Sequence, residues 1–390
     1  MTVPQLPYEL WMEIIGNGTY IPGELDYRTY NPFQSPSAYN LEGALAQVLR
    51  TRYTFTLVSR FFHKVALPTL YQTLCITNCN QLSTIMRCLD ANTTRSRMSP
   101  NVQEHGLLVR RIHIAAHAKW SWPKSFADPI PGTVQFPNLI IVSGNGNRLE
   151  SDEFGDFFRK EFLKRCSAAH SIDGMWKKLL GKDIEFHKNL RSLCSPVWAW
   201  PASGPIPDSF KDNVSRIEAL TLPNFWPFAT VPLTALPSLC ALRLLMFANK
   251  NLHYVEALGE RLTFLDMTVS VGLQINLGMF PNLRTLINSV GSTYHGRCIV
   301  HSPHFGLVQV GFSDQSIISH ERFEWGMMQF MDKSLFPRLN QIRLIDLGVC
   351  WALVGEPVKR WVDQGLDQGI RLEAGDGRLL SEQVTWLYSV

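Results

Sequence analysis

The sequence is poor in charged residues and contains no concentrated run of either sign. Charged residues make up 18% of the 390 residues, and the formal net charge is +4, whereas about a quarter of an average globular protein is charged. Because no Lys/Arg-rich block is present, we expect no nucleic-acid partner. The hydrophobic content of 45% is enough for a large core, which argues against a disordered chain.

Long apolar runs and paired cysteines are also missing. No uncharged segment reaches the length of a transmembrane helix, since even LPSLCALRLLMFA is interrupted by Arg243. The first residues contain no basic stretch followed by a small-residue cleavage site, so we expect no secretion signal. The eight cysteines are scattered without a Cys-x-x-Cys pair, which is typical of reduced thiols. We therefore expect a cytoplasmic or nuclear protein that does not bind membranes.

Sequence motifs of the common enzyme classes are absent. The chain has no G-x-S-x-G, no H-E-x-x-H and no kinase signatures, and GNGN at 144–147 lacks the lysine of a phosphate-binding loop. The segment HGRCIVHSPH places four possible zinc ligands at three-residue steps, namely His295, Cys298, His301 and His304. Alternation along a strand would send successive ligands to opposite faces. We expect no enzyme activity, no metal and no cofactor.

The first 76 residues instead contain apolar helical segments. Pro7 and Glu9 suit the first turn of a helix, so LPYELWMEII predicts a helix over 7–15 that stops at Gly16. Residues 16–43 are rich in Gly, Pro, Asn and Tyr without a period, which predicts a long loop. Helical spacing resumes at 44 and continues to Pro68, where we expect the helix to end. Residues 73–77 predict a strand.

These segments resemble an F-box. Leu-Pro-x-Glu-Leu followed by paired isoleucines is similar to the opening of that domain, and LVSRFFHKVALPTLYQTLCI at 57–76 is similar to its later half. The long loop at 16–43 departs from the compact F-box and resembles F-box-like domains of fungal proteins. The resemblance implies a surface that binds a Skp-family adaptor, formed by Leu6, Pro7, Leu10, Ile14, Ile15, Leu57, Val58 and Phe61. In the alternative interpretation, residues 6–76 are an N-terminal cap that buries its apolar stripes against the rest of the chain.

A repeated phrase organises the remaining three hundred residues. Phe/Leu-Pro-x-Leu occurs at 136–139, 236–239, 280–283 and 336–339, and each copy leads into a short apolar segment. Similar segments of the form L-x-x-L-x-L lie at 109–114, 190–195, 217–222, 262–267 and 305–310. Their middle apolar residues are separated by 27, 22, 23, 21, 22 and 34 residues, counted from Leu193 through Leu220, Leu242, Leu265, Leu286 and Val308 to Ile342. Most of these steps fall within the range of leucine-rich repeats, roughly 20–29 residues.

Short strands with this spacing predict a solenoid, because only stacking of neighbours buries the apolar face of each strand. The expected fold class is α/β (or α+β), with an N-terminal helical F-box-like domain at 1–76 and a linker or first repeat at 77–104. An irregular leucine-rich-repeat solenoid with a C-terminal cap is expected over 105–390. We expect helices at 150–165, 251–262 and 357–365 and a last strand at 370–373. Residues between the inward leucines are expected to form a concave target-binding face, with candidates His113, Thr221, Arg243, Asp266, Gln309 and Arg343.

Together these features resemble the leucine-rich-repeat class of F-box proteins. That resemblance implies the substrate receptor of a Skp–cullin–F-box ubiquitin ligase, which binds a Skp-family adaptor, and through it a cullin, with its helices. The repeats would bind a target protein. Two alternatives stay open: a leucine-rich-repeat interaction scaffold outside any ligase and, more remotely, an enzyme on an unrecognised α/β scaffold.

Overall fold

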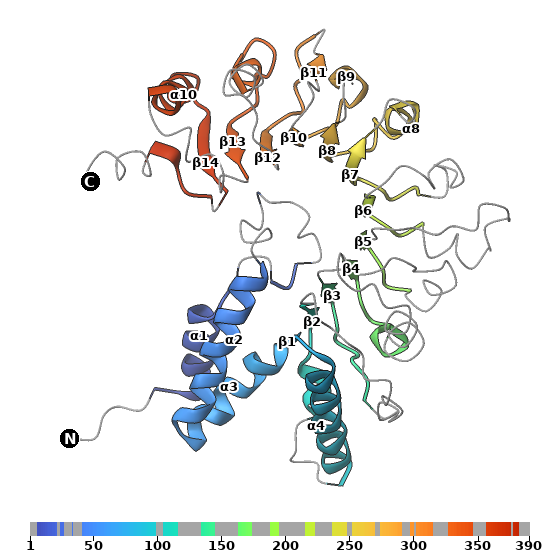
Figure 1. Ribbon diagram of the computed structural model, residues 1–390, viewed down its shortest axis with the longest axis vertical. Coiled ribbons are helices and arrows are strands. Elements are labelled where there is room, and N and C mark those ends of the chain that lie inside the picture. The colour runs from blue at the N-terminus through green and yellow to red at the C-terminus, as the bar shows by residue number, and fades with distance from the viewer. Residues whose placement is uncertain are drawn as a thin grey trace, which may run out of the picture. The chain divides into compact units, whose positions relative to one another are not determined.

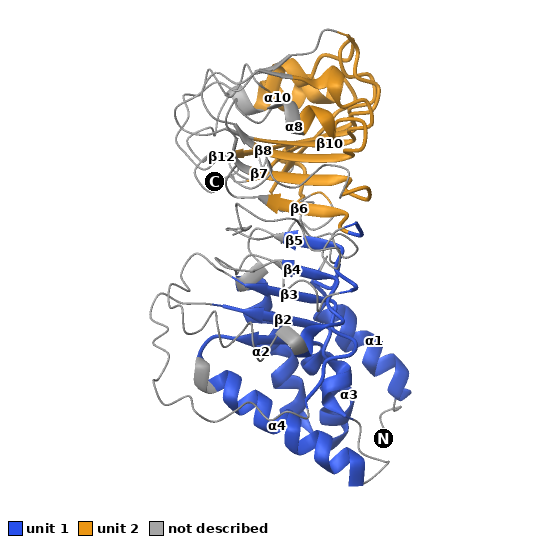
Figure 2. Cartoon of the chain, turned by 90° about the vertical axis from the view of Figure 1, so that its right-hand side faces the viewer, with its two compact units in different colours: residues 1–29, 37–216 blue, residues 30–36, 217–390 orange. Residues whose placement is uncertain are grey.

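The computed structural model divides the chain into two compact units (Figure 2): unit 1 contains residues 1–29 and 37–216, and unit 2 contains residues 30–36 and 217–390. The residues that the structure describes are 6–21, 24–26, 33, 41–98, 104–115, 134–144, 163–173, 188–194, 215–222, 236–247, 252–269, 274–290, 297–299, 302–314, 327–345, 356–375 and 377–381. Both units combine helices with parallel strands, so the fold is α/β.

The described residues of unit 1 contain five short parallel strands that neighbour one another in chain order. They are β1 Thr73–Ile76, β2 Arg111–Ile114, β3 Ile141–Gly144, β4 Ser171–Asp173 and β5 Ser192–Cys194. The register places one apolar residue of each strand in a single buried row, formed by Leu74, Ile112, Val142, Ile172 and Leu193. Because side chains alternate along a strand, the residues next to this row point to the opposite face of the sheet.

Where unit 1 is described, four α-helices accompany these strands, together with the short 3-10 helices η2 His105–Leu108 and η5 Leu163–Cys166. The bounds are α1 Tyr8–Gly18, α2 Leu41–Val58, α3 Arg60–Gln72 and α4 Cys79–Met98. Helix α4 buries Leu82, Met86 and Leu89 and lies beside β1 and β2 in Figure 1. Most of the segment expected as a linker or first repeat is therefore a helix. Residues 19–21, 24–26 and 33, which lie between α1 and α2, are in neither helices nor strands.

Unit 2 repeats the same arrangement, with seven parallel strands in one sheet within its described ranges. They are β6 Ala219–Leu222, β7 Ala241–Phe247, β8 Phe264–Val269, β10 Thr285–Val290, β12 Gln309–Asp314, β13 Gln341–Leu344 and β14 Arg371–Ala374. A buried apolar row again crosses them, formed by Leu220, Leu242, Leu265, Leu286, Val310, Ile342 and Leu372. Helices α8 Leu252–Ala257 and α10 Glu356–Asp367 lie on the same side of these strands (Figure 1). A separate pair joins β9 Gln274–Asn276 to β11 Arg297–Ile299, and the 3-10 helix η9 Leu277–Met279 follows β9.

The repeated Phe/Leu-Pro-x-Leu phrase forms the same turn in all four places. The backbone N–H of the last leucine donates to the carbonyl oxygen of the first residue, at 3.2, 3.2, 3.0 and 3.1 Å in chain order. Proline suits the second position of such a turn because its φ is already fixed there. The first residue and the leucine of each copy are buried. In both FPNL copies the asparagine amide also donates to a backbone carbonyl of an earlier segment, at 2.7 Å.

Most of the strands expected from the repeat are present, as is the helix expected at 357–365. The helix expected at 251–262 is shorter, since α8 ends at Ala257. One marker was wrong: the residue aligned with Leu286 is Val310, not Val308, so this repeat is two residues longer than expected. Strand β4 was not expected, since SID is too short to give a pattern. Most of the helix expected at 150–165 lies outside the described residues.

Candidate protein-interaction surfaces

Most of the adaptor-binding residues expected from the F-box resemblance contribute exposed apolar surface in unit 1. Leu10 and Ile14 on α1 are 43% and 48% exposed. A ring contact between Tyr8 and Phe61, with centroids 6.4 Å apart, connects the start of α1 to the start of α3. We call this exposed apolar surface the helical patch; it consists of Leu6, Pro7, Tyr8, Leu10, Ile14, Leu57, Val58 and Phe61.

Ile15 does not belong to the helical patch. It is 1% exposed and packs against Val65 and Ala66 of α3. Partly buried aromatic and sulfur side chains surround this cluster, including Trp11 and Phe62, whose ring centroids are 5.0 Å apart. The structure therefore places Ile15 in the core beneath the patch, because adjacent residues on a helix point in different directions and only one of the two isoleucines can face outward.

The apolar stripe expected to run through LVSRFFHKV is divided between two helices. Ser59 separates α2 from α3 and is the N-cap of α3. Its side-chain oxygen accepts a hydrogen bond from the backbone N–H of Phe62 at 3.2 Å. The break leaves Leu57 and Val58 exposed at the end of α2, whereas Phe62 enters the core. Phe61 is thus exposed, whereas its sequence neighbour Phe62 packs against the core cluster.

Pro68 does not end its helix, contrary to expectation. It lies inside α3, which continues to Gln72. A proline cannot donate to the carbonyl four residues earlier, which here belongs to Lys64. The hydroxyl of Tyr8 donates to that carbonyl oxygen instead, at 3.3 Å. Helix α1 thereby satisfies a group that Pro68 leaves open, and α1 itself continues past Gly16 to Gly18.

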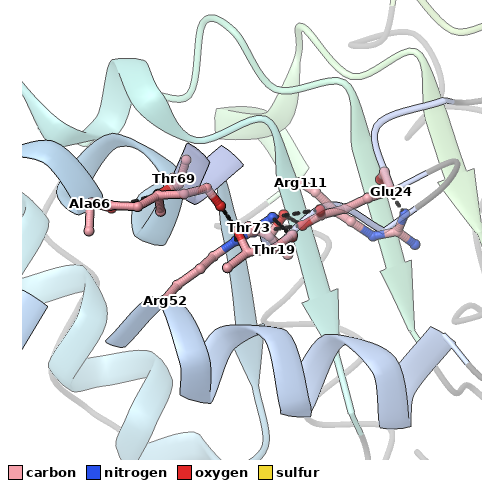
Figure 3. A network of polar contacts seen from close by, with 8 residues as sticks. Thr19, Glu24, Arg52, Ala66, Thr69, Thr73 and Arg111 are labelled. Carbon is pink, nitrogen blue, oxygen red and sulfur yellow. Dashed lines mark hydrogen bonds and ion pairs between the residues drawn. The ribbon is translucent and has the colours of Figure 1, made fainter. Parts of the chain in front are cut away.

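A buried polar network lies on the other side of these helices (Figure 3). The two terminal nitrogens of Arg52 donate to the two carboxylate oxygens of Glu24, at 2.9 and 2.8 Å. Arg52 also donates through Nε to the hydroxyl of Thr19, at 3.3 Å. Glu24 and Arg52 are both nearly fully buried. Arg52, in the middle of α2, therefore connects this helix to the end of α1 and to the loop that follows α1.

The same network continues into the strands. Thr73 on β1 donates its hydroxyl to Glu24 Oε1 at 2.5 Å, and Arg111 on β2 donates to the backbone oxygen of Glu24 at 2.6 Å. A second terminal nitrogen of Arg111 donates to Ser143 Oγ on β3 at 2.8 Å. Thr73 and Arg111 occupy the row next to the buried apolar row. Glu24 thus lies over the face of β1 and β2 that was expected to be concave.

His113 is the candidate of that face in unit 1. Its Nδ1 shares a hydrogen bond of 3.0 Å with Ser143 Oγ, and the ring is buried. Burial, and secondly the positive charge of Arg111, lower the pKa of His113 to about 4. A hydroxyl group beside an imidazole is also the arrangement of a nucleophile and its general base in some enzymes. A histidine with this pKa is a weak base at neutral pH, and Ser143 is buried, so the pair is better suited to structure than to catalysis.

The other five candidates lie on the corresponding face of the strands in unit 2. Thr221, Arg243, Asp266 and Arg343 share one row, and Gln309 lies two positions earlier along its strand, on the same face. Arg243 Nε and an oxygen of Asp266 form an ion pair at 2.8 Å. Asp266 and Arg343 are buried, whereas Gln309 and Arg243 are half-buried. These candidates therefore form a surface whose charges are already paired.

Side-chain amides connect four strands along this face. Thr285 donates to Gln309 at 3.0 Å, Gln309 donates to Gln341 at 2.7 Å, and Gln341 donates to Glu373 at 2.6 Å. Arg343 Nε donates to the same oxygen of Glu373 at 3.0 Å. Each amide acts both as donor and as acceptor, so the network fixes the orientation of these polar side chains.

Among the residues considered as metal ligands, His304 has a structural role. His304 accepts the backbone N–H of Leu307 on Nδ1 at 3.1 Å, so its Nε2 carries the proton and donates to the carbonyl of Phe280 at 2.9 Å. Both ring nitrogens are thus engaged. Cys298 lies in β11, and His295 and His301 fall outside the described residues. Within the described ranges, no group of three His, Cys, Asp or Glu side chains could hold a metal ion.

Comparison with protein-family models and with curated proteins finds no match to this sequence. None of the helices in the described part of the chain has the length and hydropathy needed to cross a bilayer. Function is therefore inferred from the residues and their geometry.

Sequence reasoning missed the polar residues that organise these surfaces. Glu24 lies in a segment without periodicity, and Arg52 occupies one position of an otherwise ordinary helix. The available signal was the arginine within RIHI at 111–114, since a charged residue inside a short buried strand needs a partner. That signal identifies Arg111 but not the residues that it contacts.

Proposed function

We propose that this chain is the target-receptor subunit of a Skp–cullin–F-box ubiquitin ligase. The observation that carries the proposal is the helical patch. Seven of the eight residues that the F-box resemblance marks for adaptor binding are exposed, namely Leu6, Pro7, Leu10, Ile14, Leu57, Val58 and Phe61. Exposed large apolar side chains that gather on one surface are typical of protein-interaction sites.

In this proposal the helical patch acts by burial of apolar area in a groove of the adaptor, not by chemistry. Removing apolar surface from water contributes roughly 25 cal/mol per Å², so a few leucine and isoleucine side chains provide a substantial part of the binding energy. The aromatic core formed by Trp11 and Phe62 holds α1 against α3 and keeps the patch preorganised. The repeat strands would hold a target protein, and the ligase subunits bound through the adaptor would modify it by proximity.

One observation favours the alternative of a repeat scaffold outside any ligase. Arg52 and Glu24 connect the helices to β1 and β2 of the same unit, through Thr73 and Arg111. A terminal cap of a repeat array packs in this way, because it must cover the strand at its end of the stack. A cap does not require the helical patch, and this difference separates the two functions.

Co-purification of the full chain with a recombinant Skp-family adaptor tests the proposal. We expect a 1:1 complex in size-exclusion chromatography, and we expect the double substitution L10D/I14D to abolish it while the far-ultraviolet circular dichroism spectrum stays unchanged. The control is L366D, because Leu366 is an exposed leucine on α10 of unit 2. Failure of the unsubstituted chain to bind the adaptor would favour the scaffold alternative.

A further inference from the structure

An aromatic side chain from the long loop occupies the predicted concave face of unit 2. Phe33 belongs to the segment 30–36, which is part of this unit. Its ring packs against a cluster of buried apolar residues, formed by Ala219, Ala241, Phe264, Ile287 and Ile345. Phe33 itself is only half-buried. The cluster is therefore the floor of a site, and Phe33 is its occupant.

Small residues make room for this ring. Ala219 and Ala241 stand side by side in the register, on the face where neighbouring strands carry larger side chains. Gly311 is also on this face, and a Cβ added there would lie 2.6 Å from Cδ1 of Ile345. A side chain at position 311 would push Ile345 out of its place in the floor. The two alanines and Gly311 thus determine the shape of the apolar floor on which the Phe33 ring lies.

A fixed cation completes the site. The guanidinium carbon of Arg343 lies 4.9 Å from the centroid of the Phe33 ring, within the distance at which a cation is attracted to a π face. Arg343 is buried and is held by Glu373, which Gln341 also contacts. Glu373 balances the charge of Arg343 and fixes the orientation of its guanidinium group. Arg343 is therefore preorganised to contact an aromatic ring, and it discriminates little between ligands of different net charge.

We propose that this surface binds an aromatic side chain of a target polypeptide, and that Phe33 occupies it as an intramolecular mimic in the free chain. The occupant on the face is itself a peptide side chain, so the partner class is an extended polypeptide that carries an exposed phenylalanine or a similar aromatic residue. An apolar floor and a desolvated guanidinium favour an aromatic ring over an aliphatic side chain of similar size.

An internal occupant changes the apparent affinity for a target. A tethered group competes at an effective concentration on the order of millimolar, so an external ligand binds only when Phe33 leaves, and its apparent dissociation constant is raised. Phe33 would then act as a built-in competitor that excludes weak ligands and yields to a stronger target. The inference rests on the proposed function only in regarding that target as a ligase substrate.

The test adds the Phe33 segment back as a separate peptide. The probe is a capped peptide of residues 31–38, NPFQSPSA, and saturation-transfer difference NMR follows its binding to the full chain. We expect the F33A chain to bind this peptide at least about tenfold more tightly than the unsubstituted chain does. We expect the peptide with alanine in place of Phe33 to lose binding, and the peptide with leucine there to bind more weakly than the original.

A second substitution locates the binding. In the double variant F33A/A241L the added side chain would fill the space of the ring, so binding of the peptide should be lost. The folding of each variant is checked by circular dichroism, and if F33A does not fold, the same titration is carried out with F33L. Absence of peptide binding to the folded F33A or F33L chain, or equal binding of the alanine peptide, would overturn the proposal and leave Phe33 as a structural plug. Adaptor capture depends on the helical patch and is measured separately, so failure of one proposal is distinguishable from failure of the other.

Discussion

Arg52 and Glu24 face each other through two hydrogen bonds of 2.9 and 2.8 Å, although 28 residues separate them in the chain. This ion pair fixes part of the loop that distinguishes the chain from a compact F-box. Glu24 lies on the strand side of the helices, where Thr73 and Arg111 contact it, whereas Leu10 and Ile14 are exposed to solvent. The described part of the loop is therefore compatible with an open helical patch.

Substitution of Glu24 by glutamine should destabilise unit 1. E24Q keeps the size of the side chain but leaves Arg52 buried without an opposite charge, and the loss of one partner of a buried ion pair costs about 3 kcal/mol or more. We expect the free energy of unfolding, measured by urea denaturation with circular dichroism, to fall by about that amount. E13Q is the control, because Glu13 is an exposed glutamate on α1. A loss below about 1 kcal/mol in E24Q would contradict a structural role for the pair.

The parts of the fold that could be predicted from the sequence are those that depend on local pattern. Each strand of the repeat has its own apolar spacing, and each Phe/Leu-Pro-x-Leu turn closes within four residues, so short windows contain the necessary information. The two-residue error at Val308 arose because the apolar residues at 308 and 310 both fit the pattern, and only pairing with β10 separates them.

The parts that could not be predicted depend on partners far away in the chain. Pro68 normally indicates the end of a helix, but Tyr8, which precedes the long loop, supplies a donor for the carbonyl of Lys64. Ile14 and Ile15 are chemically equivalent in a pattern, and only the packing of α3 decides which one is buried. Phe33 lies in a segment without any period, so nothing in the sequence places it on the strands of unit 2.

The two isoleucines of α1 should differ strongly when each is truncated to alanine. Ile15 is in a closed cluster, so I15A leaves a cavity and should lower the free energy of unfolding by about 2–5 kcal/mol. Ile14 is 48% exposed, so I14A should cost less than about 1 kcal/mol while weakening adaptor capture. Chemical denaturation and adaptor binding of both variants check this contrast. Similar stability losses would mean that Ile14 is a core residue and that the patch is smaller than described.

Tyr8 and Pro68 should be energetically coupled through Lys64. In the unsubstituted chain, Y8F removes the donor to the Lys64 carbonyl and should cost about 0.5–1 kcal/mol. In P68A the helix supplies its own N–H to that carbonyl, so Y8F should cost less in that background. A double-mutant cycle measured by urea denaturation gives the coupling energy directly. A cycle that is additive within error would show that the Tyr8 hydroxyl is satisfied by solvent.

His113 should make the stability of unit 1 depend on pH in the acidic range. The unfolded histidine has a pKa near 6.5, whereas burial and Arg111 lower the pKa of the folded one to about 4. Below pH 6.5 the unfolded chain therefore binds a proton that the folded chain does not, and the contribution of this group to stability decreases as the pH falls. The loss is complete near pH 4, where the folded histidine also becomes protonated, and it amounts to at most about 3 kcal/mol.

Substitution by glutamine isolates this effect, because H113Q retains a hydrogen-bonding side chain without a titrating ring. We expect the free energy of unfolding of the unsubstituted chain to fall more steeply between pH 6.5 and 4 than that of H113Q, in urea titrations at half-unit pH steps. H63Q, at an exposed position on α3, controls for the general loss of a histidine. Parallel curves for H113Q and the unsubstituted chain would show that the pKa of His113 is the same in the folded and the unfolded chain, which would contradict the lowered pKa.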